Sequence, residues 1–158
     1  MQHSKFDIIG ISVRTTNENG QSSVDIPELW RRFFAEGILE RIPDKLDMSV
    51  YCVYTDYEKD FTKPYTAILG CRVKNLKTIP EGMVGKVIPD GEFVKFTAKG
   101  DITQGSVFFE WKKIWESKIP RKYTTDFEVY GEKAQDQKNS EVDIFIAVYT
   151  PLGHKVGI

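Results

Sequence analysis

Two stretches of this chain resemble one another, and this internal likeness constrains the fold more than any other feature. Residues 30–34 read Trp-Arg-Arg-Phe-Phe, and residues 111–115 read Trp-Lys-Lys-Ile-Trp. Further along, the segment VYTDYEKD at 53–60 resembles VYGEKAQD at 129–136, so that Tyr54 corresponds to Tyr130. Similarity at two corresponding places indicates a duplicated supersecondary unit. The alternative is a coincidence between short apolar patterns.

The central part of each copy has the periodicity of a helix. Apolar residues at i, i+3, i+4 and i+7 predict a helix over residues 26–39, with Asp25 as its N-cap. The same spacing predicts a second helix that begins near Asp101, forms a capping box with Gln104 and ends before Pro120.

Strand-like runs flank these helices in the same order in both halves. We expect an α+β fold of duplicated βαββ units, covering about residues 5–75 and 84–150 of a single domain of residues 1–158. A pseudo-twofold axis would relate the units, giving an antiparallel sheet with two helices and a ligand cleft between the halves. Runs rich in β-branched and aromatic residues predict the strands at 6–13, 48–57, 65–73, 126–131 and 141–149, and two extended pieces within 85–98.

Charge and terminal composition exclude several classes of protein. Twenty-two basic residues nearly balance 23 acidic ones, so the basic surface of a nucleic-acid-binding protein is not expected. The sequence has neither an apolar signal core nor a run long enough to span a membrane, which predicts a cytoplasmic protein without a membrane partner. Cys52 and Cys71 both fall in predicted strands and are expected to be buried thiols.

An acidic residue inside an aromatic strand is the most informative single position. Glu128 stands in the run Phe127-Glu128-Val129-Tyr130, and strand alternation places it on the same face as Tyr130. If that face lines a cleft, a partly desolvated carboxylate meets aromatic walls. Such a site suits a cationic or amine-bearing aromatic ligand, through charge pairing and cation–π attraction. The alternative is an exposed face on which Glu128 is an ordinary surface charge.

Other aromatic and acidic residues are candidates for the same cleft. Asp143 and Phe145 share a face of the last strand, and the aromatic neighbours on that face favour the cleft over solvent. The helix aromatics could line the cleft or simply pack on the sheet, as large aromatics on amphipathic helices often do. These helix residues are Trp30, Phe34, Trp111 and Trp115.

Signals for catalysis are poor. His3 and His154 lie near the two ends, outside the predicted elements, and neither a phosphate-binding glycine loop nor metal-ligand spacing appears. We therefore assign no catalytic residue, no metal and no cofactor. One enzymatic alternative stays open, in which Glu128 is the general base of a small hydrolase and a tyrosine assists it.

The strand motifs resemble those of a known family. The run FEVY at 127–130, a polar loop, DIFIAVY at 143–149 and VYTDYEKD at 53–60 look like the GyrI-like small-molecule-binding domain. That family includes gyrase-inhibitory proteins and the effector-binding domains of AraC-type and multidrug-sensing transcription activators. The resemblance implies that Glu128 is the pocket glutamate and that Asp143 is the acidic residue of the last strand. Aromatic pocket residues vary in that family, and Tyr51, Trp111 and Trp115 are the candidates here.

The resemblance also bears on the role of the chain. Regulators of this type carry a helix-turn-helix domain before the binding domain, whereas here the first predicted strand begins almost at Met1. A stand-alone binding protein, or an excised effector domain, is therefore expected. Our leading hypothesis is a protein that binds amphipathic, cationic organic compounds for drug sensing or sequestration, linked to transcription regulation. The alternatives are the hydrolase and a gyrase-inhibitor-like module that binds an unknown protein partner.

Overall fold

Eight strands form one antiparallel sheet. The structure is a computed structural model, and it describes residues 1–150. Across the sheet the strands lie in the order β1, β6, β8, β7, β3, β4, β2, β5. Their bounds are β1 Gln2–His3, β2 Phe6–Thr15, β3 Val50–Thr55, β4 Tyr65–Val73, β5 Val84–Ile88, β6 Gly91–Gly100, β7 Thr125–Tyr130 and β8 Ser140–Ala147.

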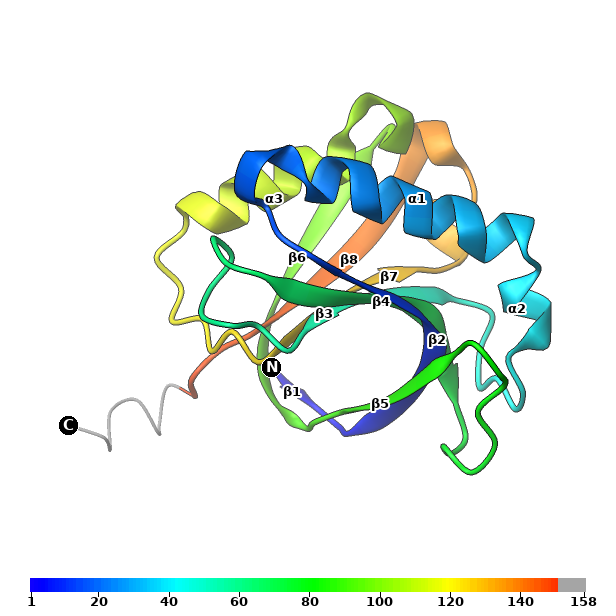
Figure 1. The fold of residues 1–158 in the computed structure, drawn as a ribbon. Coiled ribbons are helices and arrows are strands. Elements are labelled where there is room, and N and C mark those ends of the chain that lie inside the picture. The colour runs from blue at the N-terminus through cyan, green and yellow to red at the C-terminus, as the bar shows by residue number, and fades with distance from the viewer. Residues whose placement is uncertain (151–158) are drawn as a thin grey trace.

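Helices cover one face of this sheet. In Figure 1, α1 and α3 both lie across the same side of the strands, with α2 beyond the end of α1. The α-helices are α1 Ser22–Ala35, α2 Ile38–Arg41 and α3 Ser106–Glu116, and the short 3-10 helices are η1 Glu18–Gly20, η2 Ile102–Gln104, η3 Glu132–Ala134 and η4 Gln137–Asn139.

The predicted duplication is confirmed. The first half contributes β2, α1, β3 and β4, and the second half contributes β6, α3, β7 and β8 in the same order. Strands β3 and β7 pair in the middle of the sheet, where Cys52 lies directly opposite Glu128. Tyr54 corresponds to Tyr130 in the repeat, so Cys52 and Glu128, each two residues earlier, also correspond to each other. These two residues are thus both equivalent in the repeat and paired across the two strands. The pair therefore lies on the pseudo-twofold axis. Only one of its two members, Glu128, has a carboxylate.

Two short strands curl the sheet. Strand β1 pairs with β6 at one edge, yet only Ser4 and Lys5 separate it from β2, which lies next to the other edge. A flat sheet would hold these places roughly 30 Å apart, whereas the link reaches only about 10 Å. Strand β5 repeats the arrangement, since it pairs with β2 while only Pro89 and Asp90 separate it from β6. The two edges must therefore approach each other, as the lower half of Figure 1 shows.

The curl gives the sheet two differently packed faces. On the helix side, Phe33 of α1 and Ile114 of α3 are almost completely buried against the strands. On the inner side of the curl, Phe127 and Phe145 stack with ring centroids 4.8 Å apart. His3, predicted to lie outside any element, belongs to β1 and packs against this inner aromatic cluster.

The first helix begins and ends earlier than predicted. Its start is Ser22, whose N–H donates to the carbonyl of Thr16, so Asp25 lies in the first turn and is not the N-cap. Pro27 consequently falls inside the helix, where it has no N–H to donate to the carbonyl of Ser23. The helix ends at Ala35, and Gly37, with φ 63°, turns the chain into the separate helix α2.

The second helix also differs at its start. The Asp101 side chain does cap a helix, but it accepts from the N–H of Thr103 and caps the 3-10 turn η2. The predicted capping box with Gln104 is therefore wrong. Gly105, with φ 88°, separates this turn from α3.

Three further predictions concern thiols, membrane spans and the C-terminus. Cys52 and Cys71 are buried free thiols, as expected. No helix within residues 1–150 is both long and apolar enough to cross a membrane. His154 lies outside the described residues.

Candidate functional site

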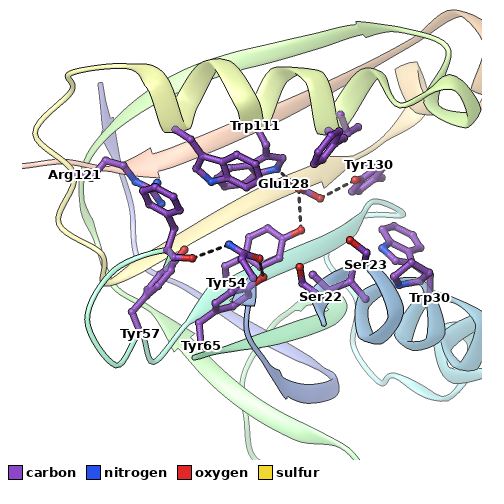
Figure 2. A pocket seen from close by; sticks show the side chains of 17 residues that line it. Ser22, Ser23, Trp30, Tyr54, Tyr57, Tyr65, Trp111, Arg121, Glu128 and Tyr130 are labelled. Atoms are coloured by element: carbon purple, nitrogen blue, oxygen red, sulfur yellow. Dashed lines mark hydrogen bonds between the residues drawn. The ribbon is translucent and has the colours of Figure 1, made fainter. Parts of the chain in front are cut away.

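A cavity of about 290 Å³ lies between α1, α3 and the middle of the sheet. Its volume is close to the lower end of the range for small-molecule sites, about 300 Å³. Figure 2 shows side chains from both helices and from the central strands pointing into it. Its lining is mainly aromatic, with Trp30, Tyr54, Tyr57, Phe61, Tyr65, Phe108, Trp111, Trp115 and Tyr130.

In the cavity walls, aromatic residues of one half pack against aromatic residues of the other half. Trp30 of the first half packs edge-on against Tyr130 of the second, with ring centroids 4.7 Å apart. Trp111 of the second half packs edge-on against Tyr54 of the first, at 5.4 Å. These are the residues that the sequence repeat relates to one another. Packing across the pseudo-twofold axis therefore builds the cavity from both copies.

Glu128 lies at the bottom of this cavity. Its side chain is only 2% exposed and accepts three hydrogen bonds. Tyr54 Oη donates to Oε2 at 2.9 Å, Trp111 Nε1 donates to the same oxygen at 2.6 Å, and Tyr130 Oη donates to Oε1 at 2.7 Å. Two dashed lines in Figure 2 converge on this carboxylate from the tyrosines. An ionised carboxylate has about four acceptor sites, so it is nearly saturated by neutral donors.

The electrostatic balance at Glu128 is unusual because no cation compensates its charge. Among residues 1–150 it forms no ion pair. Burial raises the pKa of Glu128 above its ordinary value, and the three hydrogen bonds act in the opposite direction. Burial also raises the pKa of Tyr54 and Tyr130 well above the ordinary value, so both hydroxyls stay protonated and continue to donate.

A second buried carboxylate lies beside the cavity and is compensated. Asp126 is fully buried and accepts from Arg121 Nη2 at 2.9 Å, from Tyr57 Oη at 2.6 Å and from the Ala147 N–H at 2.8 Å. Burial raises the pKa of Asp126, while the Arg121 guanidinium opposes that rise. Arg121 and Asp126 thus neutralise each other, and Glu128 remains the uncompensated charge of the cavity.

The structure brings five of the nine predicted site residues together and leaves four elsewhere. Glu128 and four aromatics line the cavity, namely Tyr130, Trp111, Trp115 and Trp30. Phe34 does not line it, because the side chain lies on the outer surface of α1 and is 59% exposed. The expectation that it faces the cleft is wrong.

Three predicted residues on the strands face the opposite side of the sheet. Phe145 packs on Phe127 in the inner aromatic cluster, and Asp143 accepts from Thr97 Oγ1 at 2.9 Å. Tyr51 donates to Asp47 at 2.9 Å. The reason is register, since Ile144 and Cys52 are the residues opposite Glu128 and share its face. Their neighbours Asp143, Phe145 and Tyr51 must then point the other way.

Several lining residues were not predicted. Tyr54 is absent from the predicted site residues, although it corresponds to Tyr130 in the repeat and lies two residues from Cys52, so that it shares the face of Glu128. Asp126, which lies beside the cavity and does not line it, was detectable by the same alternation, as it precedes Glu128 by two. Tyr65 was detectable in the same way, because it shares a strand face with Ala67, the residue opposite Tyr54. The sequence carried no comparable signal for Arg121, Tyr57 and Phe61, because they lie in connections between elements.

Comparisons with known proteins find relatives that match over most of this chain. A family model described as Cass2, integron-associated effector binding protein, matches residues 1–148. An integron cassette protein from the mobile metagenome of Vibrio cholerae is 33% identical in sequence, with a TM-score of 0.72 and 94% of each chain covered. YobU of Bacillus subtilis (strain 168), named provisionally as a transcriptional regulator, is 25% identical over 143 residues, covering 88% of this chain and 89% of YobU.

A further solved structure has the same fold with little sequence identity. SAV2435, solved bound to tetraphenylphosphonium, gives a TM-score of 0.79 at 16% identity, with 98% of this chain and 94% of that chain covered. This similarity concerns the fold alone.

Proposed function

This chain belongs to the Cass2 family of integron-associated effector binding proteins, and from that premise we propose that it binds lipophilic organic cations in the aromatic cavity. The observation that carries the proposal is Glu128, a buried carboxylate at the bottom of the cavity without a cationic partner among residues 1–150. An uncompensated buried charge is costly to keep. A ligand that brings the opposite charge removes that cost.

The hydrogen bonding of Glu128 narrows the kind of cation. Tyr54, Trp111 and Tyr130 occupy three acceptor sites of the carboxylate. An ammonium group with several N–H donors would find only about one acceptor site free, whereas a cation with dispersed charge needs only proximity. The surrounding aromatic faces attract such a cation by cation–π interaction. We therefore propose that aryl phosphonium, quaternary ammonium and dye cations bind better than small primary amines.

The comparisons support this ligand class and suggest a biological role. SAV2435, whose fold is similar, was solved with the lipophilic cation tetraphenylphosphonium. The family is named for effector binding, and YobU carries the name of a regulator. We propose that this chain senses or sequesters such cations in the cytoplasm, in connection with transcription regulation.

Titration of the protein with tetraphenylphosphonium tests the proposal. Trp30, Trp111 and Trp115 all line the cavity, so quenching of tryptophan fluorescence should saturate at one ligand per chain, and calorimetry should give the same stoichiometry. A neutral compound of the same shape without an acceptor oxygen, such as tetraphenylsilane, should bind more weakly. Equal affinity for the two compounds would sink the charge argument.

A hydrolytic activity is the second candidate, and one observation favours it. Burial raises the pKa of Glu128, which makes its carboxylate a stronger base than that of an exposed glutamate, and the Tyr54 and Tyr130 hydroxyls lie within hydrogen-bond distance of it. Turnover of an activated ester that is abolished by Glu128→Gln would support this role. Saturable binding of the cation without any turnover would contradict the hydrolytic role and support binding only.

A further inference from the structure

We infer that Arg121 forms a second recognition point in the cavity, which binds a neutral hydrogen-bond acceptor carried by the same ligand that places its positive charge near Glu128. This inference rests on the proposed function, and it adds the chemistry expected at the other end of the ligand. The preferred ligand is then a lipophilic cation with a carbonyl, ether or phosphoryl oxygen.

The hydrogen-bonding state of Arg121 is the starting point. Its side chain lines the cavity but is only 5% exposed. Of the guanidinium nitrogens, Nη2 donates to Asp126, while Nε and Nη1 are buried and have no acceptor within residues 1–150. Buried N–H groups without an acceptor are rare in proteins, and each one needs an explanation such as water, an ion or a functional role.

The fold itself does not require this unpaired guanidinium. Lys45 is the counterpart of Arg121 in the first half, because each forms an isolated bridge at the end of the last strand of its own half, Lys45 to Val73 of β4 and Arg121 to Val148, which follows β8. Lys45 Nζ donates to the carbonyls of Leu39 and Ile42, both at 2.9 Å, so that side chain closes a helix end. The second half places an arginine here instead and aims it at the cavity and Asp126.

Arg121 lies where a ligand held at Glu128 can reach it. Trp111 connects the two places, because its Nε1 donates to Glu128 at 2.6 Å and its ring centroid is 6.0 Å from Arg121 Cζ. Figure 2 shows Arg121 on one side of Trp111 and Tyr130 on the other side of Glu128. A single ligand spanning the indole would therefore contact both charged groups.

Aromatic rings cover the guanidinium. Tyr123 lies over it at 4.3 Å, in a backbone conformation with φ 56° that is uncommon for a bulky residue. Phe61 lies 6.0 Å away and also lines the cavity, on the connection between β3 and β4. A ligand that turns the Phe61 ring aside would give its acceptor access to the unpaired N–H groups.

The charge balance indicates that this acceptor is neutral. Asp126 already neutralises Arg121 at 2.9 Å, and Glu128 adds another negative charge nearby. An anionic acceptor would be the third carboxylate-like group in the same buried volume and would be repelled. A carbonyl or phosphoryl oxygen accepts the hydrogen bonds without that repulsion.

A series of three phosphonium ions tests the inference on the full chain. Each has three phenyl groups and one side arm of equal length, which is an alkyl chain, a chain ending in a methyl ester, or a chain ending in a carboxylate. The ester should bind about tenfold more tightly than the alkyl compound, as expected for a hydrogen bond to a charged group. The carboxylate should bind more weakly than the ester.

The variant Arg121→Lys tests whether the guanidinium causes the preference for the ester over the alkyl compound. It keeps the positive charge beside Asp126 but loses the fork of donors, so the alkyl compound should keep its affinity and the ester should lose its advantage. Lys122→Met, at the exposed neighbouring position, is the matched control and should change neither. If Arg121→Lys fails to fold by circular dichroism, the charge-neutral double variant Arg121→Met with Asp126→Asn should give the same loss.

The outcomes separate this inference from the proposed function. An ester that binds no better than the alkyl compound, or an ester preference that survives in Arg121→Lys, overturns the role of Arg121 while the cation site stands. A carboxylate that binds most tightly overturns the neutral acceptor. Failure of every phosphonium to bind overturns the proposed function, and the inference with it.

Discussion

Glu128→Gln is the substitution that separates charge from shape at the centre of the site. The amide is nearly the same size and can still accept from Tyr54 and Trp111, so the cavity should keep its form. A phosphonium centre about 6 Å from a carboxylate, at an effective dielectric constant of about 20, gains about 3 kcal/mol from the charge. We therefore expect tetraphenylphosphonium to bind about 100-fold more weakly to the variant. The neutral tetraphenylsilane should lose little affinity.

The same substitution should weaken cation binding but increase the free energy of unfolding. Because the pKa of Glu128 is raised in the folded protein, the folded state holds this proton more tightly than the unfolded state does. Stability therefore increases as the pH falls through the raised pKa, and at neutral pH the burial of the charge is a penalty. Glu128→Gln should remove that penalty and raise the urea midpoint at pH 7.

Calorimetry and urea unfolding of the same samples check both effects, with Asp143→Asn as the matched control. Asp143 lies on the neighbouring strand but on the opposite face of the sheet, where it accepts from Thr97. This control makes the same chemical change and should leave cation affinity unchanged. If both variants weaken the cation equally, or if Glu128→Gln weakens the cation and the neutral compound by the same factor, the reasoning is refuted.

Three other predictions follow from the same geometry. Cation affinity should fall as the pH is lowered through the raised pKa of Glu128 and level off at the affinity of Glu128→Gln, whereas a pH-independent affinity would show that the carboxylate is not the partner. Trp111→Phe removes the donor at 2.6 Å from Glu128 but keeps a ring, so the midpoint of that pH profile should move upward, and an unchanged midpoint would contradict the role of this hydrogen bond. Phe145→Ala should lower the free energy of unfolding by about 3–5 kcal/mol, measured by denaturant titration, and should leave cation binding intact in the folded fraction.

Local sequence patterns were sufficient to predict much of the architecture. The strand at 65–73 has the predicted bounds, and the hairpins of both halves pair as expected. The repeat indicated the duplicated fold, because the period of apolar residues and the position of turn residues are properties of the chain itself. Helix ends were less accurate, since the start of α1 depends on a contact between Ser22 and Thr16 that competes with the capping signal at Asp25.

The sequence by itself determined that a carboxylate stands among aromatic residues in a duplicated α+β fold. Only the tertiary structure decided which face of each strand meets the cavity, because alternation divides a strand into two faces without saying which one the helices cover. Pairing with Ile144 and Cys52 places Glu128 on the covered face and sends Asp143 and Tyr51 to the other. Arg121 and Phe61 reach the cavity from irregular segments, whose path is set by long-range packing and has no period that a sequence could display.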